Sequence, residues 1–168
     1  MAKALGASVS PPIAVTPEHD LGGFACGKPP LDDWLRQRAL KSDGTTARTY
    51  VVCSSQTVVA YYALAVGSID RNLVPSKMRR NAPEQIPVNI LARLAVDARC
   101  HGQGIGRAML KDALLRTLQL SRIAGVRALM VHAIDDDANR FYLKYGFLEF
   151  PAGTKTLFLP IETIEATI

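Results

Sequence analysis

The sequence has no long hydrophobic run and few cysteines. Its longest apolar run, residues 58–66, is far shorter than the roughly 20 residues of a membrane-spanning helix, and residues 1–12 lack the hydrophobic region of a signal peptide. Cys26, Cys53 and Cys100 are odd in number and never spaced as C-x-x-C, which argues against a disulfide framework or a zinc ribbon. We therefore expect a soluble cytoplasmic protein without a membrane segment, and a flexible terminus over residues 1–12.

Repeats, low-complexity tracts and Gly/Pro/Ser-rich linkers are also lacking. The 168 residues are 48% hydrophobic and 21% charged, which predicts a single domain over residues 1–168. Lysine and arginine number 20 against 15 acids, a formal charge of +5. This excess favours anionic partners such as nucleic acid or a phosphorylated cofactor, but it identifies neither.

The first half of the chain predicts one helix and a β-meander. Apolar residues between positions 31 and 39 fall at helical spacing after a proline pair, with a basic outer face. Residues 49–53 and 57–66 are rich in β-forming side chains, and residues 54–56 between them have the composition of a hairpin turn. Residues 71–83 contain four basic residues, two prolines and no acid, which predicts an exposed loop or a short helix.

The second half predicts a strand, helix and strand crossover. Residues 88–96 and 126–134 are apolar strands, and a helix from about 104 to 122 lies between them, with Ile105, Ala108, Met109 and Leu115 toward a core. Such a crossover is right-handed and makes its two strands parallel neighbours.

A short helix and a hairpin complete the predicted fold. Asp135 and the two acids after it favour a helix start, the helix reaches Tyr145, and Gly146 suits the position after its end. Residues 147–150 and 155–159 are expected to be closing strands. The predicted fold class is α/β, with a mixed, mostly antiparallel central sheet, one parallel crossover and flanking helices.

Three glycines follow the strand at residues 88–96. Gly102, Gly104 and Gly106 suit a loop whose backbone N–H groups hold a phosphate chain at a helix N-terminus, although glycines after a strand can also simply turn the chain. A dinucleotide fingerprint needs its third glycine at position 107, which is arginine, and an acid about 20 residues later. A triphosphate loop needs G-K-S or G-K-T, which is absent.

Two motifs resemble the GNAT acetyltransferase superfamily, over roughly residues 48–159. The first is the pyrophosphate loop R/Q-x-x-G-x-G/A, read here as HGQGIG with His101 in the Arg/Gln position; the second, A-x-x-F-Y-x-x-x-G-F, runs from Ala138 to Phe147. The resemblance implies acetyl-CoA as the cofactor. It implies these cofactor-binding residues: Leu94, Ala95, Val96, His101, Gly102, Gln103, Gly104, Ile105, Gly106, Arg107, Asn139 and Tyr142.

The resemblance also implies a mechanism. The pantetheine arm would pair with the strand that ends at Val96, so that the backbone N–H of Leu94 or Ala95 stabilises the thioester oxyanion. Tyr142 matches the position of the family's acid, which would donate a proton or hydrogen bond to the leaving thiolate. The alternative for Tyr142 is a packing role, as for the other aromatic residues of this helix.

Few bases are available to deprotonate an amine acceptor. A lysine side chain is the free base in only about one molecule in 2,500 at pH 7, whereas about a tenth of an α-amine is free, so this scarcity favours an α-amine. Candidate bases are His132, Glu84 and Asp97, although His132 lies in an apolar strand where a core histidine is the usual finding. His19 and His101 have no partners at ligand spacing, so no metal site is expected.

A narrower resemblance covers nearly the whole chain. The segments FACG and LDDWL near the N-terminus, VAYYAL, ARLAVD and the ending TLFLP resemble the GNAT toxins of bacterial toxin-antitoxin pairs. This implies acetylation of the α-amine of aminoacyl-tRNA, which blocks translation, a ribbon-helix-helix antitoxin and a homodimer. Basic residues expected to meet tRNA phosphates, or to be ordinary surface residues, are Arg36, Arg38, Lys41, Lys77, Arg79, Arg80 and Arg93.

Two other functions are left open by the sequence. One is an acetyltransferase for a small-molecule amine or a protein N-terminus, on which the basic surface has no role. The other is a non-catalytic CoA-binding module that acts through protein interaction; the presence of Tyr142 and Gly104 argues against it.

Overall fold

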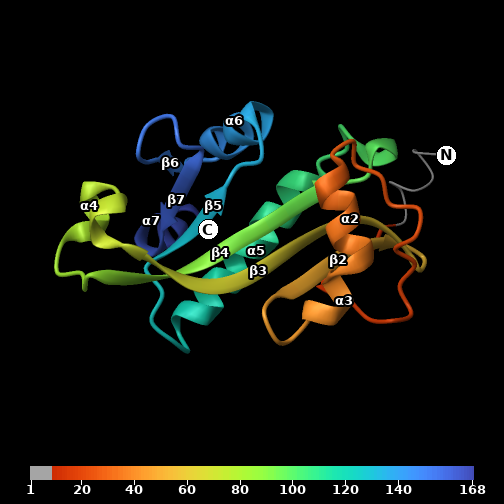
Figure 1. Cartoon of the computed structure of the whole chain (residues 1–168), viewed down its shortest axis with the longest axis horizontal. Coiled ribbons are helices and arrows are strands. Elements are labelled where there is room, and N and C mark those ends of the chain that lie inside the picture. Colours follow the sequence, from red (N-terminus) through yellow and green to blue (C-terminus); the bar gives the residue numbers. More distant parts are fainter. Residues whose placement is uncertain (1–8) are drawn as a thin grey trace. The chain divides into compact units, whose positions relative to one another are not determined.

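The computed structural model describes residues 9–168, and within them the strands form one mixed sheet (Figure 1). The strand order is β1-β2-β3-β4-β5-β7-β6. The pair β4/β5 is parallel, whereas β1/β2, β2/β3, β5/β7 and β6/β7 are antiparallel. The strands are β1 Ile13–Ala14, β2 Arg48–Ser54, β3 Thr57–Asp70, β4 Gln85–Val96, β5 Ala128–His132, β6 Leu148–Glu149 and β7 Thr156–Pro160. The predicted fold class is confirmed.

Helices occupy most of the connections between strands. They are α2 Pro29–Gln37, α3 Ala39–Ser42, α4 Ser76–Arg79, α5 Ile105–Ser121, α6 Asp136–Lys144 and α7 Ile161–Thr167, with short 3-10 helices η1 Arg71–Leu73 and η2 Ala98–Cys100. Among the described helices, none is long and apolar enough to cross a membrane. The short helix predicted as one alternative for residues 71–83 is confirmed by η1 and α4, and most of the segment is exposed. Val74 and Met78 depart from the prediction, because both are buried in a core cluster.

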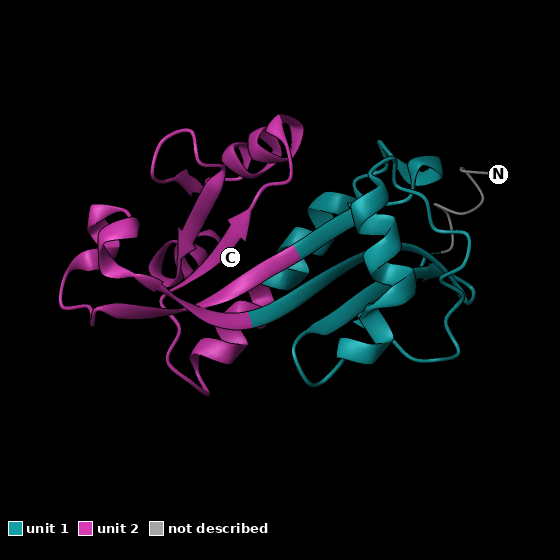
Figure 2. Ribbon diagram, viewed as in Figure 1, with its two compact units in different colours: residues 1–65, 93–113 teal, residues 66–92, 114–168 magenta. Residues whose placement is uncertain are grey.

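The chain divides into two compact units, each built from two stretches of sequence (Figure 2). Unit 1 comprises residues 1–65 and 93–113, and unit 2 comprises residues 66–92 and 114–168. Each unit is therefore completed by residues far apart in the chain. The single domain expected over residues 1–168 stays a prediction.

Unit 1 is organised around the β2–β3 hairpin and helix α2. Pro29 and Pro30 occupy the first turn of α2, where backbone N–H groups have no partner within the helix, so their absence does not destabilise it. Leu35 of α2 and Phe24 are buried in one core cluster with Tyr61 of β3. Residues 1–8 of the expected flexible terminus lie outside the described residues. At the other end of that stretch, the Ser10 backbone N–H donates to the Cys53 carbonyl at 2.8 Å.

Unit 2 contains the parallel pair and helix α6. The register of β4 with β5 runs from Asn89 opposite Leu129 to Leu91 opposite Val131, as the predicted crossover requires. The Asp135 carboxylate accepts a hydrogen bond from the Ala138 N–H at 2.9 Å and caps α6. The expected helix start is therefore confirmed.

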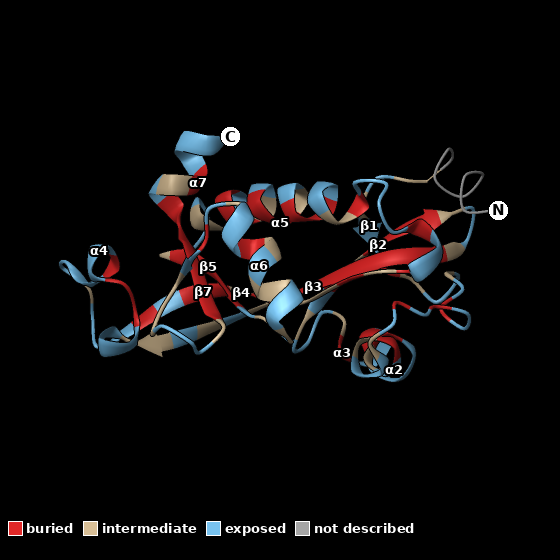
Figure 3. Cartoon of the chain, turned by 90° about the horizontal axis from the view of Figure 1, so that it is seen from above, coloured by how far each residue is buried: buried red, intermediate tan, exposed pale blue. Residues whose placement is uncertain are grey.

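Burial corrects two details of the sequence prediction. Helix α5 buries one side and exposes the other (Figure 3), but Ala108 and Leu115, expected in the core, lie on the exposed side. The buried residues of α5 instead form adjacent pairs, such as Met109 with Leu110 and Ala113 with Leu114, and the pairs repeat about once per helical turn. His132 is also exposed, because it is the last residue of β5 and not part of its buried run.

Candidate functional site

The last residues of β4 extend beyond its pairing with β5. Their register ends at Leu91, whereas β4 continues to Val96. Leu94 and Val96 are partly exposed, and Ala95 is 4% exposed in the core of unit 1. An extended segment of this kind can pair its backbone with a ligand that lies alongside it as an added strand.

A buried carboxylate fixes the chain directly after β4. Asp97 is 1% exposed and accepts hydrogen bonds from the backbone N–H of Ala25 at 3.1 Å and of Arg99 at 2.9 Å, while the Arg99 guanidinium also pairs with it. Burial alone would raise the pKa of Asp97, but these hydrogen bonds and the charge of Arg99 outweigh it and lower that pKa. Asp97 thus caps η2 and orients the chain that enters the glycine loop.

The glycine loop joins η2 to the 17-residue helix α5. Gly102 and Gly104 both have φ near +79°, and nothing lies within 4 Å of a Cβ built at either position. The His101 ring donates from Nε2 to the Val96 carbonyl at 2.7 Å and so holds the loop against the end of the strand. The loop is therefore open, requires glycine and precedes a helix, which fits a pyrophosphate group.

Tyr142 lies on α6 in unit 2. Its ring makes edge contacts with Phe141 and Phe147, with centroids 5.1 and 5.3 Å apart, and its side chain is 5% exposed. Among described residues, none forms a hydrogen bond with its hydroxyl, and burial raises the pKa of Tyr142 above its usual range. The phenol is therefore a neutral, unused donor at physiological pH.

Asn139, one turn before Tyr142, has an unused acceptor. Its Nδ2 donates to Glu149 at 3.4 Å, but its Oδ1 is buried and has no hydrogen-bond partner among residues 9–168. A buried unpaired carbonyl is costly, so this atom is suited to accept a hydrogen bond from an N–H donor of a ligand.

None of the three candidate bases is in an environment that suits a general base. Asp97 is fully used by its hydrogen bonds, Glu84 is exposed, and His132 is exposed with Nδ1 2.9 Å from the Thr156 hydroxyl. The expectation of a core histidine at position 132 is wrong. No group of three or more His, Cys, Asp or Glu residues suited to a metal ion occurs in residues 9–168.

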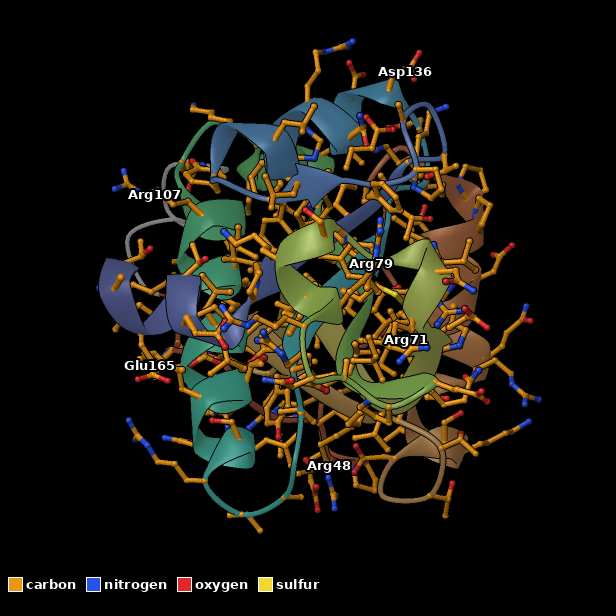
Figure 4. The ribbon with its side chains drawn as sticks, turned by 90° about the vertical axis from the view of Figure 1, so that its left-hand side faces the viewer. Arg48, Arg71, Arg79, Arg107, Asp136 and Glu165 are labelled. Carbon is orange, nitrogen blue, oxygen red and sulfur yellow. The ribbon has the colours of Figure 1, made fainter. Side chains whose placement is uncertain are left out.

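The basic residues of the sequence prediction fall in both units. Lys77, Arg79 and Arg80 lie on or after α4 in unit 2; all three are exposed, and Arg79 lies over the Phe150 ring at 5.5 Å. Figure 4 shows Arg71 and Arg79 on the segment between β3 and β4.

In unit 1, Arg36, Arg38 and Lys41 are exposed around α2 and α3. Arg36 is already paired with Asp33 at 3.1 Å. Arg38 and Lys41 form no ion pair with another residue of 9–168 and are surface cations. The predicted tRNA-binding residues of this region therefore differ, because Arg36 is already engaged in an ion pair whereas Arg38 and Lys41 are not.

Sequence reasoning missed an aromatic platform under Arg93. The Arg93 guanidinium lies 4.3 Å from the centre of the Trp34 ring, which is stacked on Tyr61 at 6.0 Å and 10°. The Tyr61 hydroxyl donates to the Leu31 carbonyl at 2.7 Å, so α2 holds both rings. The three residues come from separate elements, and no local pattern could have connected them.

Comparison with known proteins identifies the family. The model of the acetyltransferase (GNAT) domain matches residues 45–149. A tRNA-acetylating toxin of Mycobacterium tuberculosis is 39% identical over 95% of this chain and 96% of its own. The sequence-based resemblance is thereby confirmed.

Two solved structures have the same fold over almost their whole length. AtaT in complex with acetyl-methionyl-tRNAfMet is 27% identical with a TM-score of 0.87, covering 95% of this chain and 99% of its own. A tyrosine-to-phenylalanine mutant of AtaT, bound to the C-terminus of the antitoxin AtaR and acetyl-CoA, is 25% identical with a TM-score of 0.82, covering 96% and 98%. The protein belongs to the GNAT family and is an acetyltransferase.

Proposed function

We propose that this protein is a toxin that transfers the acetyl group of acetyl-CoA to the α-amino group of aminoacyl-tRNA and thereby blocks translation. The observation that carries the proposal is the 39% identity to a tRNA-acetylating toxin over 95% of the chain. The AtaT complexes with acetyl-CoA and with acetylated methionyl-tRNA agree with both substrates.

The donor half of the site is the end of β4 with the glycine loop. Acetyl-CoA supplies an activated thioester and a pyrophosphate. The backbone of residues 102–107 would hold the pyrophosphate, because Gly102 and Gly104 leave it exposed before α5. The backbone N–H of Leu94 or Ala95 would stabilise the oxyanion that forms when the amine attacks. His101, Gln103, Ile105 and Arg107 complete the proposed loop contacts, with His101 acting through the Val96 carbonyl.

Tyr142 is the proposed acid. Because burial raises its pKa, the phenol keeps its proton at neutral pH and can donate it to the leaving thiolate. Asn139 would contact the pantetheine arm through its unpaired Oδ1. Both residues lie on α6, whose start is fixed by the Asp135 cap.

The acceptor requires little help from the protein. With a pKa near 8, about a tenth of an α-amine is already free base at pH 7. This agrees with the surroundings of the three candidate bases. Glu84 and His132 are exposed, and the carboxylate of Asp97 is occupied by hydrogen bonds, so none is arranged as a dedicated base. The exposed cations of α2 to α4 and Arg93 would contact tRNA phosphates.

The partners are proposed from the same relatives. We expect a ribbon-helix-helix antitoxin to neutralise the enzyme, a homodimer as the assembled form, and the cytoplasm as its location. Size-exclusion chromatography with light scattering measures the assembly; a monomer at working concentration would contradict the dimer.

The function is tested by offering each class of acceptor with radiolabelled acetyl-CoA. Charged tRNA, the same tRNA after deacylation, a polyamine and a peptide with a free N-terminus are compared under identical conditions. We expect label only on charged tRNA, in the aminoacyl moiety. Preferential labelling of the polyamine or peptide would replace the proposal with the small-amine or N-terminus function, and no CoA release with any acceptor would indicate a non-catalytic module.

A further inference from the structure

Arg93 is unusual among the arginines of unit 1. Three others each pair with a carboxylate: Arg36 with Asp33, Arg48 with Asp43, and Arg99 with Asp97. The remaining two, Arg38 and Arg107, are exposed to solvent. Arg93 is only partly exposed, yet no acid or hydrogen-bond acceptor of the described residues meets its guanidinium. Its N–H donors are therefore available to a ligand, although the group has already lost part of its hydration.

The surroundings of Arg93 hold it in place without neutralising it. The guanidinium lies over the Trp34 ring, and Trp34 is stacked on the fully buried Tyr61. Burial lowers the pKa of Arg93 from its usual value, although the group remains a cation at any physiological pH. A planar cation fixed on an aromatic platform, with its fork of donors unused, is suited to bidentate contact with a phosphate.

The position of Arg93 in β4 connects it to the reaction. It directly precedes Leu94 and Ala95, whose amides are the proposed oxyanion donors. The aminoacyl group of tRNA is esterified to the terminal ribose, so only one nucleoside separates the α-amine from the nearest internucleotide phosphate. Arg93 lies one residue before the proposed oxyanion donors, and only one nucleoside separates this phosphate from the α-amine. The guanidinium is therefore placed to bind the phosphate while the amine attacks the thioester.

We propose that Arg93, supported by Trp34, binds an internucleotide phosphate of the single-stranded 3′ end of the acceptor and so positions the α-amine. This inference rests on the proposed function and gives Arg93 a different role from the exposed arginines near α4. Those residues would contact the tRNA body through charge alone, whereas Arg93 would distinguish an aminoacyl oligonucleotide from a free amine.

The test uses three acceptors of decreasing size: charged tRNA, an aminoacylated CCA trinucleotide, and aminoacyl-adenosine, which has the base and the amine but no phosphate. We expect Arg93→Gln to lower kcat/KM about 10- to 100-fold for the first two acceptors, the loss typical of a charged hydrogen bond, and to leave aminoacyl-adenosine unchanged. Arg93→Lys should lose part of the rate on the trinucleotide, because the charge remains without the fork.

Trp34→Leu tests the platform and should lower kcat/KM for the trinucleotide about 2- to 30-fold, as expected for a lost cation–π contact. Arg122→Gln is the matched control, since Arg122 is exposed and follows α5 in unit 2. Acetyl-CoA affinity, measured by calorimetry, should be unchanged in the Arg93 and Trp34 variants. If Arg93→Gln fails to fold, Arg93→Lys and Trp34→Leu carry the same comparison.

Two results would overturn the inference. An equal loss on aminoacyl-adenosine and on the trinucleotide would mean that Arg93 acts on the base or the amine, and an unchanged rate on the trinucleotide would mean that it has no role in binding the 3′ end. Failure of the wild-type enzyme to acetylate charged tRNA would instead reject the proposed function, so the two failures are distinguishable.

Discussion

Replacing Tyr142 by phenylalanine should separate activity from stability. The side chain is 5% exposed, and its hydroxyl has no hydrogen-bond partner among the described residues. Removing a hydroxyl that makes no protein hydrogen bond breaks none, so the free energy of unfolding should stay within about 1 kcal/mol of the wild-type value or rise slightly. For a chain of this length each kcal/mol moves Tm by about 2–4 °C, and we expect Tm to stay constant or rise by a few degrees.

The same change should slow acetyl transfer strongly. General acid catalysis contributes about 10²- to 10⁴-fold, which corresponds to roughly 2.7–5.5 kcal/mol of activation free energy. The assay is single-turnover transfer to charged tRNA at saturating acetyl-CoA, with thermal unfolding recorded on the same preparations. Tyr145→Phe is the matched control, because Tyr145 caps the C-terminus of α6, its ring packs on Phe141, and it has no proposed role in the reaction.

The pH profile provides a second measurement on Tyr142. Since burial raises the pKa of Tyr142, its proton is retained as the pH rises from 7 to 9. The rate should therefore follow deprotonation of the α-amine, reaching about half its maximum near pH 8 and levelling off near pH 9. Retention of more than about a third of the wild-type rate in Tyr142→Phe would refute the acid role, because general acid catalysis contributes far more than that. A parallel loss of stability would show that Tyr142 is a packing residue.

Three further predictions concern the loop, its support and the basic surface. Gly104→Ala should cost about 1–2 kcal/mol of stability and weaken acetyl-CoA binding measured by calorimetry, because φ is +79°. Gly125→Ala should do neither, because Gly125 has no positive φ and a Cβ there meets nothing. Asp97→Asn should lower the free energy of unfolding by about 1–3 kcal/mol at pH 7, and denaturant titrations should show this gap closing below about pH 4, since a carboxylate with a lowered pKa stabilises only above its native pKa. Charge reversal of Arg79 and Arg80 together should reduce acetylation of charged tRNA steeply and flatten its salt dependence, with acetyl-CoA affinity unchanged; equal wild-type activity at low and high salt would contradict phosphate contacts.

The fold was largely predictable because its signals are local. The β-forming side chains of residues 49–53 and 57–66, the glycines before α5 and the Asp135 cap each act within a few residues, and the predicted elements follow them. The two-residue strand β1 has no such signal, since it exists only through its pairing with Val51 and Tyr50. Helix α7 was also missed, since the sequence analysis predicts no element after the strand at residues 155–159.

Only the site residues that belong to a sequence motif could be predicted. Gly104 and Tyr142 belong to motifs, and their conformations suit the predicted roles. The Arg93 platform depends on contacts between residues 93, 34 and 61, which belong to different elements and which no spacing rule relates. The exposure of His132 depends on where β5 ends, the kind of boundary that sequence periodicity locates least well.

The Asp97 hydrogen bond to Ala25 joins residues 72 positions apart in the chain. A contact of that sequence separation forms only after the intervening chain has closed a long loop, at a considerable cost in entropy. During synthesis on the ribosome, residue 25 emerges long before residue 97, so the support of the glycine loop is assembled late. A toxin that depends on this contact to shape its cofactor loop would remain inactive as a nascent chain, and would not acetylate the tRNAs that are still needed to complete it.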